Sequence, residues 1–323
     1  MPRPKVLLLL SLATLFVPAF GQSTNQARPG TLNYLEGQAS IEGRQLSPKS
    51  VGNTELQAGQ YLSTANGKAE ILLTPGVFLR LGNDSTVQMV SPNLTQTEVR
   101  LEHGHANVEV DQLHKQNTIL IDLKNGQTHL LKPGLYTFDA DNSTVHVFDG
   151  KADVYPGENL QANVKPIEVK GGRQLALTGE PTEPQHFDKD RSQDDLYKWS
   201  SLRSEYLGEA NVTLASDYAG ASSFYPGWYW AGGPYGYTWL PGDGLFWSPF
   251  GYGFYSPYYI GGGGFIYGRY GRGAYPYRGG YGYRGGYGYR GGYAHGFSNG
   301  GGFRGGAGGG GFHGGGGGGG GHR

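Results

Sequence analysis

Apolar and polar residues alternate in short runs through about residues 31–180, and this pattern constrains the fold more than any other feature of the chain. Alternation places one row of side chains on a core and the other in water, which is typical of a half-buried strand. The runs are Gln38–Glu42, Ala69–Leu73, Val77–Leu81, Val108–Val110, Asn117–Leu123, Leu135–Phe138 and Thr144–Phe148. Turn-forming residues separate them: Asn66-Gly67, Gly82-Asn83-Asp84, Asn125-Gly126, Pro133-Gly134, Asp141-Asn142 and Asp149-Gly150. Short strands with such frequent turns predict an all-β domain of antiparallel strands, with a sandwich, a barrel or a β-solenoid-like fold as alternatives.

A short unit, Gly-x-Ala-x-(Ile/Val), recurs four times within this region, beginning at Gly37, Gly67, Gly104 and Gly150. The spacing between the units is too irregular for a strict solenoid. Each unit predicts a turn glycine that leads into a strand whose small alanine faces a crowded interior. We therefore expect Ala106, in the third unit, to be buried and a larger side chain there to overpack the core.

Taken together, these elements resemble the FecR domain family. The resemblance covers about residues 32–178 and rests on the segments Gly37–Gly43, Leu56–Thr64, Gly67–Leu73, Phe78–Gly82 and Phe148–Val154. The family implies an all-β module outside the cytoplasm, first known from regulators that relay an outer-membrane transport signal to a sigma factor. The sequence shows neither the cytoplasmic N-terminal segment nor the transmembrane helix of those regulators. The resemblance therefore implies the module rather than the relay role.

The N-terminus has the pattern of a secretory signal peptide over residues 1–21. Met1–Lys5 is positively charged, Val6–Phe20 is apolar, and Ala19-Phe20-Gly21 is a small-x-small cleavage pattern before Gln22. The apolar run is shorter than the ~20 residues that span a bilayer. We expect a soluble mature chain, secreted or periplasmic, with no transmembrane segment after cleavage. The absence of cysteine fits such a compartment and excludes thiol catalysis, Cys-ligated zinc and disulfides.

A Pro-rich linker over residues 181–191 and one helix over residues 192–208 are predicted after the β domain. Ser192 and Asp195 have the spacing of a capping box, and Gly208 offers a C-terminal stop. Four residues at helical spacing predict one apolar face that docks on the β domain or on the segment behind it: Leu196, Trp199, Leu202 and Tyr206.

Residues 218–260 form an aromatic-rich segment that holds four of the five tryptophans. Gly and Pro interrupt it too often for a helix, so short strands or loops with stacked rings are expected. Two interpretations stay open: a small satellite core, or a platform of rings that binds a glycan or cell-wall polymer. The candidate rings are Trp228, Trp230, Tyr237, Trp239 and Trp247.

Residues 261–323 are rich in Gly, Tyr and Arg and contain almost no aliphatic side chains, which predicts a disordered tail. A six-residue repeat places Arg278, Arg284 and Arg290 each before Gly-Gly. From Tyr218 onward there are seven Arg, no Lys and one acid, a net charge of +6, while the preceding 217 residues carry −6 and the whole chain is neutral. This split favours a tail that interacts with other molecules or with its own domain.

Arg-Gly-Gly repeats with interleaved Tyr are typical of RNA-binding tails. Because the predicted export removes the chain from cytoplasmic RNA, no nucleic acid partner is expected. The tail is instead expected to adhere to the cell envelope, or only to solubilise the chain. Arg278, Arg284 and Arg290 complete the candidate binding surface.

Two patterns could hold a metal ion, but each has a commoner interpretation. His103 and His105 lie two apart and would share a strand face, yet exposed strand histidines are commoner than ligands. Residues 139–143 begin like a calcium loop but lack its later Gly and Glu, so a hairpin turn is favoured. We therefore expect no metal and no cofactor.

No short catalytic motif is present: neither His-Glu-x-x-His, nor Gly-x-Ser-x-Gly, nor a phosphate loop, nor a dinucleotide-binding glycine pattern. Carboxylate pairs such as Asp188 and Asp190 are not placed across a predicted cleft. The sequence predicts a non-enzymatic binding or structural protein that associates with a cell-envelope polymer, a glycan or an envelope protein. A ligand-sensing module of FecR-type relay is one alternative. A polysaccharide hydrolase is the other, since glycosidase carboxylates carry no short signature.

Overall fold

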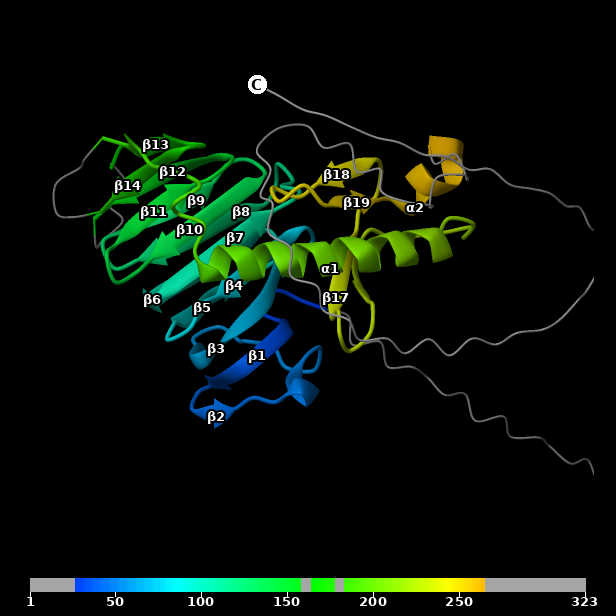
Figure 1. Cartoon of the computed structure of the whole chain (residues 1–323), viewed down its shortest axis with the longest axis horizontal. Helices are drawn as coiled ribbons and strands as arrows, with labels where there is room; N and C mark the ends of the chain where they lie inside the picture. Colours follow the sequence, from blue (N-terminus) through cyan, green and yellow to red (C-terminus); the bar gives the residue numbers. More distant parts are fainter. Residues whose placement is uncertain (1–26, 158–163, 178–182, 265–323) are drawn as a thin grey trace, which may run out of the picture. The chain divides into compact units, whose positions relative to one another are not determined.

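The computed structural model describes residues 27–157, 164–177 and 183–264. The predicted signal peptide and residues 265–323 of the predicted tail, with Arg278, Arg284 and Arg290, lie outside this part. The described residues form one large β-sheet, a long helix and two small hairpins (Figure 1).

Fifteen strands of the described part belong to the large sheet. Their bounds are β1 (Leu32–Ile41), β2 (Arg44–Gln45), β3 (Tyr61–Thr74), β4 (Val77–Leu81), β5 (Thr86–Pro92), β6 (Gln96–His103), β7 (His105–Val110), β8 (Thr118–Leu123), β9 (Gly126–Leu130), β10 (Gly134–Asp139), β11 (Thr144–Val147), β12 (Lys151–Pro156), β13 (Ile167–Lys170), β14 (Arg173–Ala176) and β15 (Gln185–His186). After them come α1 (Asp195–Asp217), β16 (Gly227–Trp230), β17 (Tyr237–Leu240), β18 (Leu245–Trp247), β19 (Gly253–Tyr255), α2 (Pro257–Tyr259) and a helical turn, η2 (Ile260–Gly264); a further turn, η1 (Pro48–Ser50), follows β2.

The large sheet has the strand order β13-β12-β9-β8-β6-β5-β3-β4-β7-β10-β11-β14-β15, and β1 pairs with β2 and β3. Of these pairs, β6–β8 is parallel and the others are antiparallel. Side chains of β8 and β10, which lie far apart in this order, nevertheless belong to one hydrophobic cluster. The sheet must therefore curl around its core, and the predicted all-β class is confirmed as one curled sheet.

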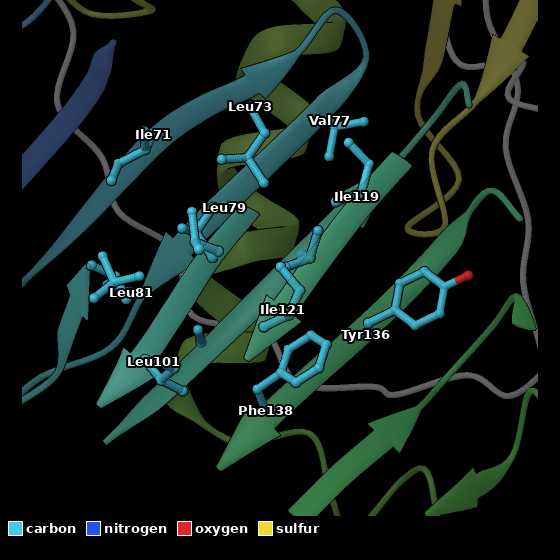
Figure 2. Packing of buried hydrophobic residues seen from close by; sticks show 14 of the residues in the cluster. Ile71, Leu73, Val77, Leu79, Leu81, Leu101, Ile119, Ile121, Tyr136 and Phe138 are labelled. Atoms are coloured by element: carbon cyan, nitrogen blue, oxygen red, sulfur yellow. The ribbon is translucent and has the colours of Figure 1, made fainter. Parts of the chain in front are cut away.

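The core lies on the inner face of this curled sheet. Side chains from β3, β4, β6, β8 and β10 gather there (Figure 2). The four alanines of the repeated unit, Ala39, Ala69, Ala106 and Ala152, are all buried in it, as the sequence predicts. Ala106 pairs with Leu81 of β4 on one side and with Phe138 of β10 on the other. Crowding from both neighbouring strands explains why the position holds a small residue.

The predicted turns are partly correct. Asn125-Gly126 and Asp141-Asn142 connect antiparallel neighbours, β8 with β9 and β10 with β11. Asn66-Gly67 is not a reversal, because it lies inside the long strand β3. A Cβ at Gly67 would lie 2.4 Å from the backbone nitrogen of Gln38 in β1, so the glycine permits the close approach of two strands rather than a turn.

The helix α1 begins close to the predicted start and ends later than predicted. The predicted capping box of Ser192 and Asp195 is wrong, because Ser192 Oγ donates to the Asp188 carbonyl instead. Asp194 caps the N-terminus, where one carboxylate oxygen accepts a hydrogen bond from the Tyr197 amide at 2.7 Å. Gly208 does not stop the helix, which continues to Asp217. A Cβ at Gly208 would lie 3.3 Å from the Cβ of Tyr252, so the glycine serves a close packing contact in mid-helix.

The predicted apolar face of α1 is also partly wrong. Leu196 and Trp199 are buried, but Leu202 and Tyr206 are exposed. The buried face mixes polar with apolar residues and comprises Leu196, Trp199, Ser200, Arg203, Ser204, Leu207, Gly208, Ala210, Asn211 and Ala215. The physical reason is that part of the outer sheet face beneath α1 is itself polar, as described below.

The segment before α1, predicted as a linker over residues 181–191, contains the edge strand β15, which pairs with β14. Phe187 then packs edge-on against His146 and Phe148, with ring centroids 5.0 Å apart in each pair. At the other end, Gly261–Gly264 still form a helical turn although the tail is predicted to begin at Gly261. Within the described ranges no helix combines the length and apolar character needed to cross a bilayer.

Candidate binding surface

A row of polar side chains crosses the outer face of the sheet. Glu70 of β3 pairs with Arg80 of β4, Arg80 with Asn107 of β7, and Asn107 with Thr137 of β10. Glu70, Arg80 and Asn107 are almost completely buried. Because α1 lies across β4 and β7 in Figure 1, the polar side chains of its buried face meet this polar row. Leu207 of the same face packs instead in an apolar cluster with Leu72 and Phe78.

An ionic cluster joins the row to the helix. Arg80 Nε donates to Glu70 Oε2 at 2.7 Å, and Arg80 Nη1 donates to Glu109 Oε2. From the helix, Arg203 Nη2 donates to Glu70 Oε1 at 2.9 Å, and the Arg203 guanidinium lies 4.0 Å from the centre of the Tyr34 ring. Two guanidinium groups and two carboxylates therefore neutralise one another in the interior.

Serine side chains of α1 complete this contact. Ser204 Oγ donates to Glu109 Oε1 at 2.7 Å, and Asn107 Nδ2 donates to Ser200 Oγ at 3.0 Å. Trp199 Nε1 donates to Glu36 Oε2 at 2.8 Å near the first turns of the helix. Directional polar contacts of this kind fix the rotation and register of α1 on the sheet more narrowly than apolar packing would.

Charge neutralisation within the cluster controls the ionisation of its members. Burial alone would raise the pKa of Glu70, but Arg203 and Arg80 outweigh it and hold the pKa at about 2. Burial would likewise lower the pKa of Arg80, but Glu109 and Glu70 raise it above its usual value. Glu70 and Arg80 are thus charged at neutral pH, and removal of either leaves the other charge buried without compensation.

Of the cations that the structure describes, none compensates the charge of the buried Asp111 carboxyl group in this way. Asp111 directly follows β7, two residues after Glu109, and its side chain is buried. No hydrogen-bond donor among the described residues reaches either of its carboxyl oxygens. Burial, followed by the neighbouring Glu109 carboxylate, raises the pKa of Asp111 well above its ordinary value. The surroundings of Asp111 therefore favour the neutral form of its carboxyl group.

The aromatic segment forms two hairpins, β16–β17 and β18–β19, beside the second half of α1. Asn211 of α1 connects both: its Nδ2 donates to Trp239 O at 2.8 Å, and its Oδ1 accepts from the Tyr255 amide at 2.7 Å. Asn33 of β1 accepts from the Tyr237 amide at 2.6 Å. An apolar cluster comprises Leu72, Phe78, Leu207, Tyr237, Trp239 and Phe254. The hairpins are thereby held against both the helix and the sheet.

The candidate rings divide between this satellite core and the surface. Tyr237 and Trp239 are buried and present no open ring face. Trp228 is half-buried and packs edge-on against Phe78, with centroids 5.1 Å apart. Trp230 is 45% exposed and Trp247 46% exposed, and they lie on different hairpins. The buried rings match the interpretation as a satellite core, and the platform interpretation stays a prediction for the exposed Trp230 and Trp247.

Trp230 is partly exposed, but neighbouring residues pack against its ring. Its ring meets Tyr237 edge-on at 5.0 Å, and a Cβ at Gly52 would lie 2.7 Å from the indole. A pocket of about 330 Å³, within the size range of small-ligand sites, includes Trp239 of β17 in its lining. It is lined by Pro75, Gln112, His114, Pro226, Trp239, Gly242 and Asp243.

The two histidines considered as metal ligands do not share a strand. His103 ends β6 and His105 begins β7, on either side of Gly104, which has a φ of 75°. Each instead faces a carboxylate: His103 Nδ1 lies 2.5 Å from Asp141 Oδ1, and His105 Nε2 lies 3.3 Å from Asp139 Oδ2. The part of the chain that the structure describes contains no group of three or more His, Asp or Glu side chains suited to a metal ion.

The remaining acidic candidates form turns. Asp139 accepts hydrogen bonds from the backbone amide and side chain of Asn142 at 2.9 and 2.7 Å, which confirms the hairpin interpretation of the segment resembling a calcium loop. Asp188 accepts from the amides of Asp190 and Arg191 at 3.1 and 3.2 Å. The pair Asp188 and Asp190 therefore lies within a surface turn before α1 and does not flank a cleft.

Neither the ionic cluster nor the burial of polar side chains on α1 is predicted from the sequence. Charged residues at Glu70, Arg80 and Glu109, each inside an alternating run, were a usable signal, because their positions share one sheet face if the three strands are neighbours. That adjacency follows from the topology, which the alternation alone does not provide.

The fold defines an all-β module in which one helix and two hairpins cover part of the outer face of a curled sheet. Residues 59–153 match the model of the FecR protein family, and the resemblance to that family is confirmed over this segment. The segment reaches from just before β3 into β12, and includes neither α1 nor the hairpins.

Two crystal structures, at 2.50 and 1.65 Å resolution, of a protein assigned as an anti-sigma factor from Parabacteroides distasonis ATCC 8503 are similar to this chain at 15% and 14% sequence identity. Each comparison covers 44% of this chain and 63% of the other, with a TM-score of 0.33. At this TM-score the likeness carries no argument about function. No curated protein matches the chain.

Proposed function

We propose that this protein is a non-enzymatic binding module that acts outside the cytoplasm, secreted or periplasmic, and associates with a polymer of the cell envelope. The observation that carries the proposal is the display of Trp230 and Trp247, each about half exposed, on hairpins that are fixed to the β-sheet. Flat indole faces suit the faces of sugar rings, so a glycan is the polymer that this surface fits.

Rigid support is what makes these rings suitable for binding. Side chains that are already ordered lose little conformational entropy when a ligand binds. Asn211 and Asn33 hold the hairpin backbones by hydrogen bonds, and Trp239 and Phe254 anchor them in an apolar cluster. The signal-peptide pattern of residues 1–21 supports the proposed location.

The test is co-sedimentation of the purified full chain with isolated cell-wall polymer. The variant Trp230→Ala/Trp247→Ala should bind about thirtyfold more weakly or worse, since an indole anchor that becomes buried on binding is worth about 2 kcal/mol or more. Leu94→Ala is the matched control, because Leu94 is a large exposed apolar side chain far from the hairpins in sequence. Equal pelleting of wild type and the double tryptophan variant would remove the rings from the account.

A second candidate function is a ligand-sensing module in FecR-type signal relay. It is supported by the family match over residues 59–153. This role requires a specific protein partner for the β domain, which affinity capture from envelope extract with the full chain as bait would identify. A single stoichiometric partner, retained by the Trp230→Ala/Trp247→Ala variant, would favour relay over polymer binding.

The proposal that the protein is not an enzyme is tested separately. We expect no release of soluble sugar from a panel of cell-wall and matrix polysaccharides incubated with the full chain. Turnover that survives repurification, and that a carboxylate-to-amide substitution abolishes, would establish the hydrolase alternative.

A further inference from the structure

Residues 204–264 are named here the aromatic lobe. They comprise the second half of α1, both hairpins, α2 and η2. The lobe contains four acidic residues, Glu205, Glu209, Asp217 and Asp243, and no Lys, Arg or His. Its net charge is therefore −4. A surface that combines many rings with only negative charges favours cationic partners, since both carboxylates and ring faces attract them.

Three tyrosine rings contact Phe224 at one end of this lobe, those of Tyr218, Tyr229 and Tyr258. With Tyr225, the neighbour of Phe224 in the chain, they form the tyrosine patch. Phe224 lies 5.7 Å from the Tyr229 ring centre and 5.8 Å from that of Tyr258. Tyr229 is fixed further, because its hydroxyl donates to the Tyr225 carbonyl at 2.6 Å. Tyr225 is 79% exposed and Tyr258 53% exposed, so the patch is open to solvent.

The patch includes the C-terminus of α1 through Tyr218, which contacts Phe224 and Tyr229. Tyr218 is the C-cap residue, and the last turn of the helix contains no basic side chain. The negative end of the helix dipole therefore points to the patch without a compensating cation of its own helix. Exposed Asp217 adds a full negative charge there. Ring faces, a carboxylate and a helix terminus thus provide three separate sources of negative potential at one place.

We propose that the tyrosine patch binds an arginine-rich polypeptide segment that lacks acidic residues, and that its occupant is residues 275–292 of a second copy of this chain. That segment carries Arg278, Arg284 and Arg290, each preceded by Tyr and followed by Gly-Gly. The whole stretch 265–323 has seven Arg and no acid, so its charge is opposite to that of the aromatic lobe. Planar guanidinium groups stack on tyrosine rings, and glycine lets the backbone approach closely.

This contact is heterologous, because the patch and the arginine segment are different surfaces. Heterologous contacts propagate from copy to copy unless a ring closes. The protein should therefore form open, concentration-dependent assemblies, weakened by salt because exposed charges are screened. This inference does not depend on the proposed polymer binding, and its test contains no polymer.

The experiment titrates a fluorescent synthetic peptide of residues 275–292 into the full chain and follows anisotropy, with sedimentation velocity of the full chain in parallel. In Tyr225→Leu/Tyr258→Leu the dissociation constant should rise about five- to thirty-fold, and the assemblies should shrink. Tyr61→Leu is the matched control, an exposed tyrosine of β3 outside the lobe that should leave both readouts unchanged. A peptide with Gln at its three Arg positions should not bind.

Asp217→Asn is a second variant that keeps the proposal testable if the tyrosine variant fails to fold, since Asp217 is exposed at the helix end. It should weaken peptide binding about two- to five-fold and leave the thermal midpoint unchanged. The proposal is overturned if the patch variants bind as tightly as Tyr61→Leu, or if the Gln peptide binds as well as the Arg peptide. Binding that both tyrosine variants weaken equally would also overturn it, because the patch would then have no special role.

Discussion

Replacing Glu70 by Gln tests the ionic cluster that fixes α1 to the sheet. The pKa of Glu70 in the folded protein is about 2, against an ordinary value of 4.5. At about 1.4 kcal/mol per pKa unit, this difference corresponds to about 3 kcal/mol of folding free energy contributed by the charged form. The expected loss at pH 7 is about 3–5 kcal/mol, because the substitution leaves Arg80 and Arg203 sharing one carboxylate in the interior.

The pH dependence distinguishes this cause from a packing defect. The pKa of Glu70 is lower in the folded protein than in the unfolded chain. The stabilisation that the charged Glu70 carboxylate contributes is therefore fully present above about pH 5 and is lost as the pH falls toward 2. The difference in unfolding free energy between wild type and Glu70→Gln should therefore be about 2 kcal/mol smaller at pH 3 than at pH 7. Urea unfolding followed by tryptophan fluorescence at both pH values measures it.

A matched control and a clear contrary result are available. Glu102→Gln removes an exposed carboxylate of β6 and should change the unfolding free energy by less than about 0.5 kcal/mol at either pH. A Glu70→Gln cost below about 1 kcal/mol at pH 7, or one that does not change with pH, would show that the cluster does not stabilise the fold as a set of compensated charges.

Four further substitutions test other parts of the fold. Ala106→Leu should lower the unfolding free energy by about 1–3 kcal/mol, since Leu81 and Phe138 flank the site, and an unchanged urea midpoint would refute the inward placement of this alanine. Gly59→Ala, at a φ of 83° with open space around it, should lower the unfolding free energy by about 1–2 kcal/mol. Gly104→Ala should lower it by more, because the new Cβ would lie 2.3 Å from Ser85 Oγ. Equal losses in the two variants would contradict the steric explanation. Asp111→Asn should become progressively more stable than wild type as the pH rises above 4, by up to about 1.4 kcal/mol per pH unit. The reason is that the Asp111 carboxyl group of the folded wild type retains a proton that the unfolded chain has lost. If the unfolding free energies of the two proteins run parallel from about pH 4 to 9, the raised pKa of Asp111 is contradicted.

The strands and their buried alanines could be predicted because each depends on local pattern. All seven alternating runs lie in or at the ends of strands. The start of α1 was also close to its observed position, since the aspartates before it can cap a helix whatever else surrounds them. Such signals act within a few residues along the chain, so no knowledge of the tertiary fold is needed.

The end of α1, its buried face and the fate of each ring could not be predicted, because tertiary neighbours decide them. Gly208 resembles a helix stop until Tyr252 is known to pack against it. Arg203 resembles a solvent-exposed residue until Glu70 and Tyr34 are placed beneath it. Trp239 and Trp247 have similar local sequences, yet one is buried and the other exposed, because only Trp239 lies in the cluster formed with Leu72, Phe78 and Phe254.

Export is the central claim on which the proposed function depends, and the intact mass of the protein recovered from fractionated cells tests it most directly. We predict a chain that begins at Gln22, found in the periplasmic or extracellular fraction. Recovery of the chain with Met1–Gly21 still attached, in the cytoplasmic fraction, would contradict the account and make the tail's arginines candidates for RNA binding instead.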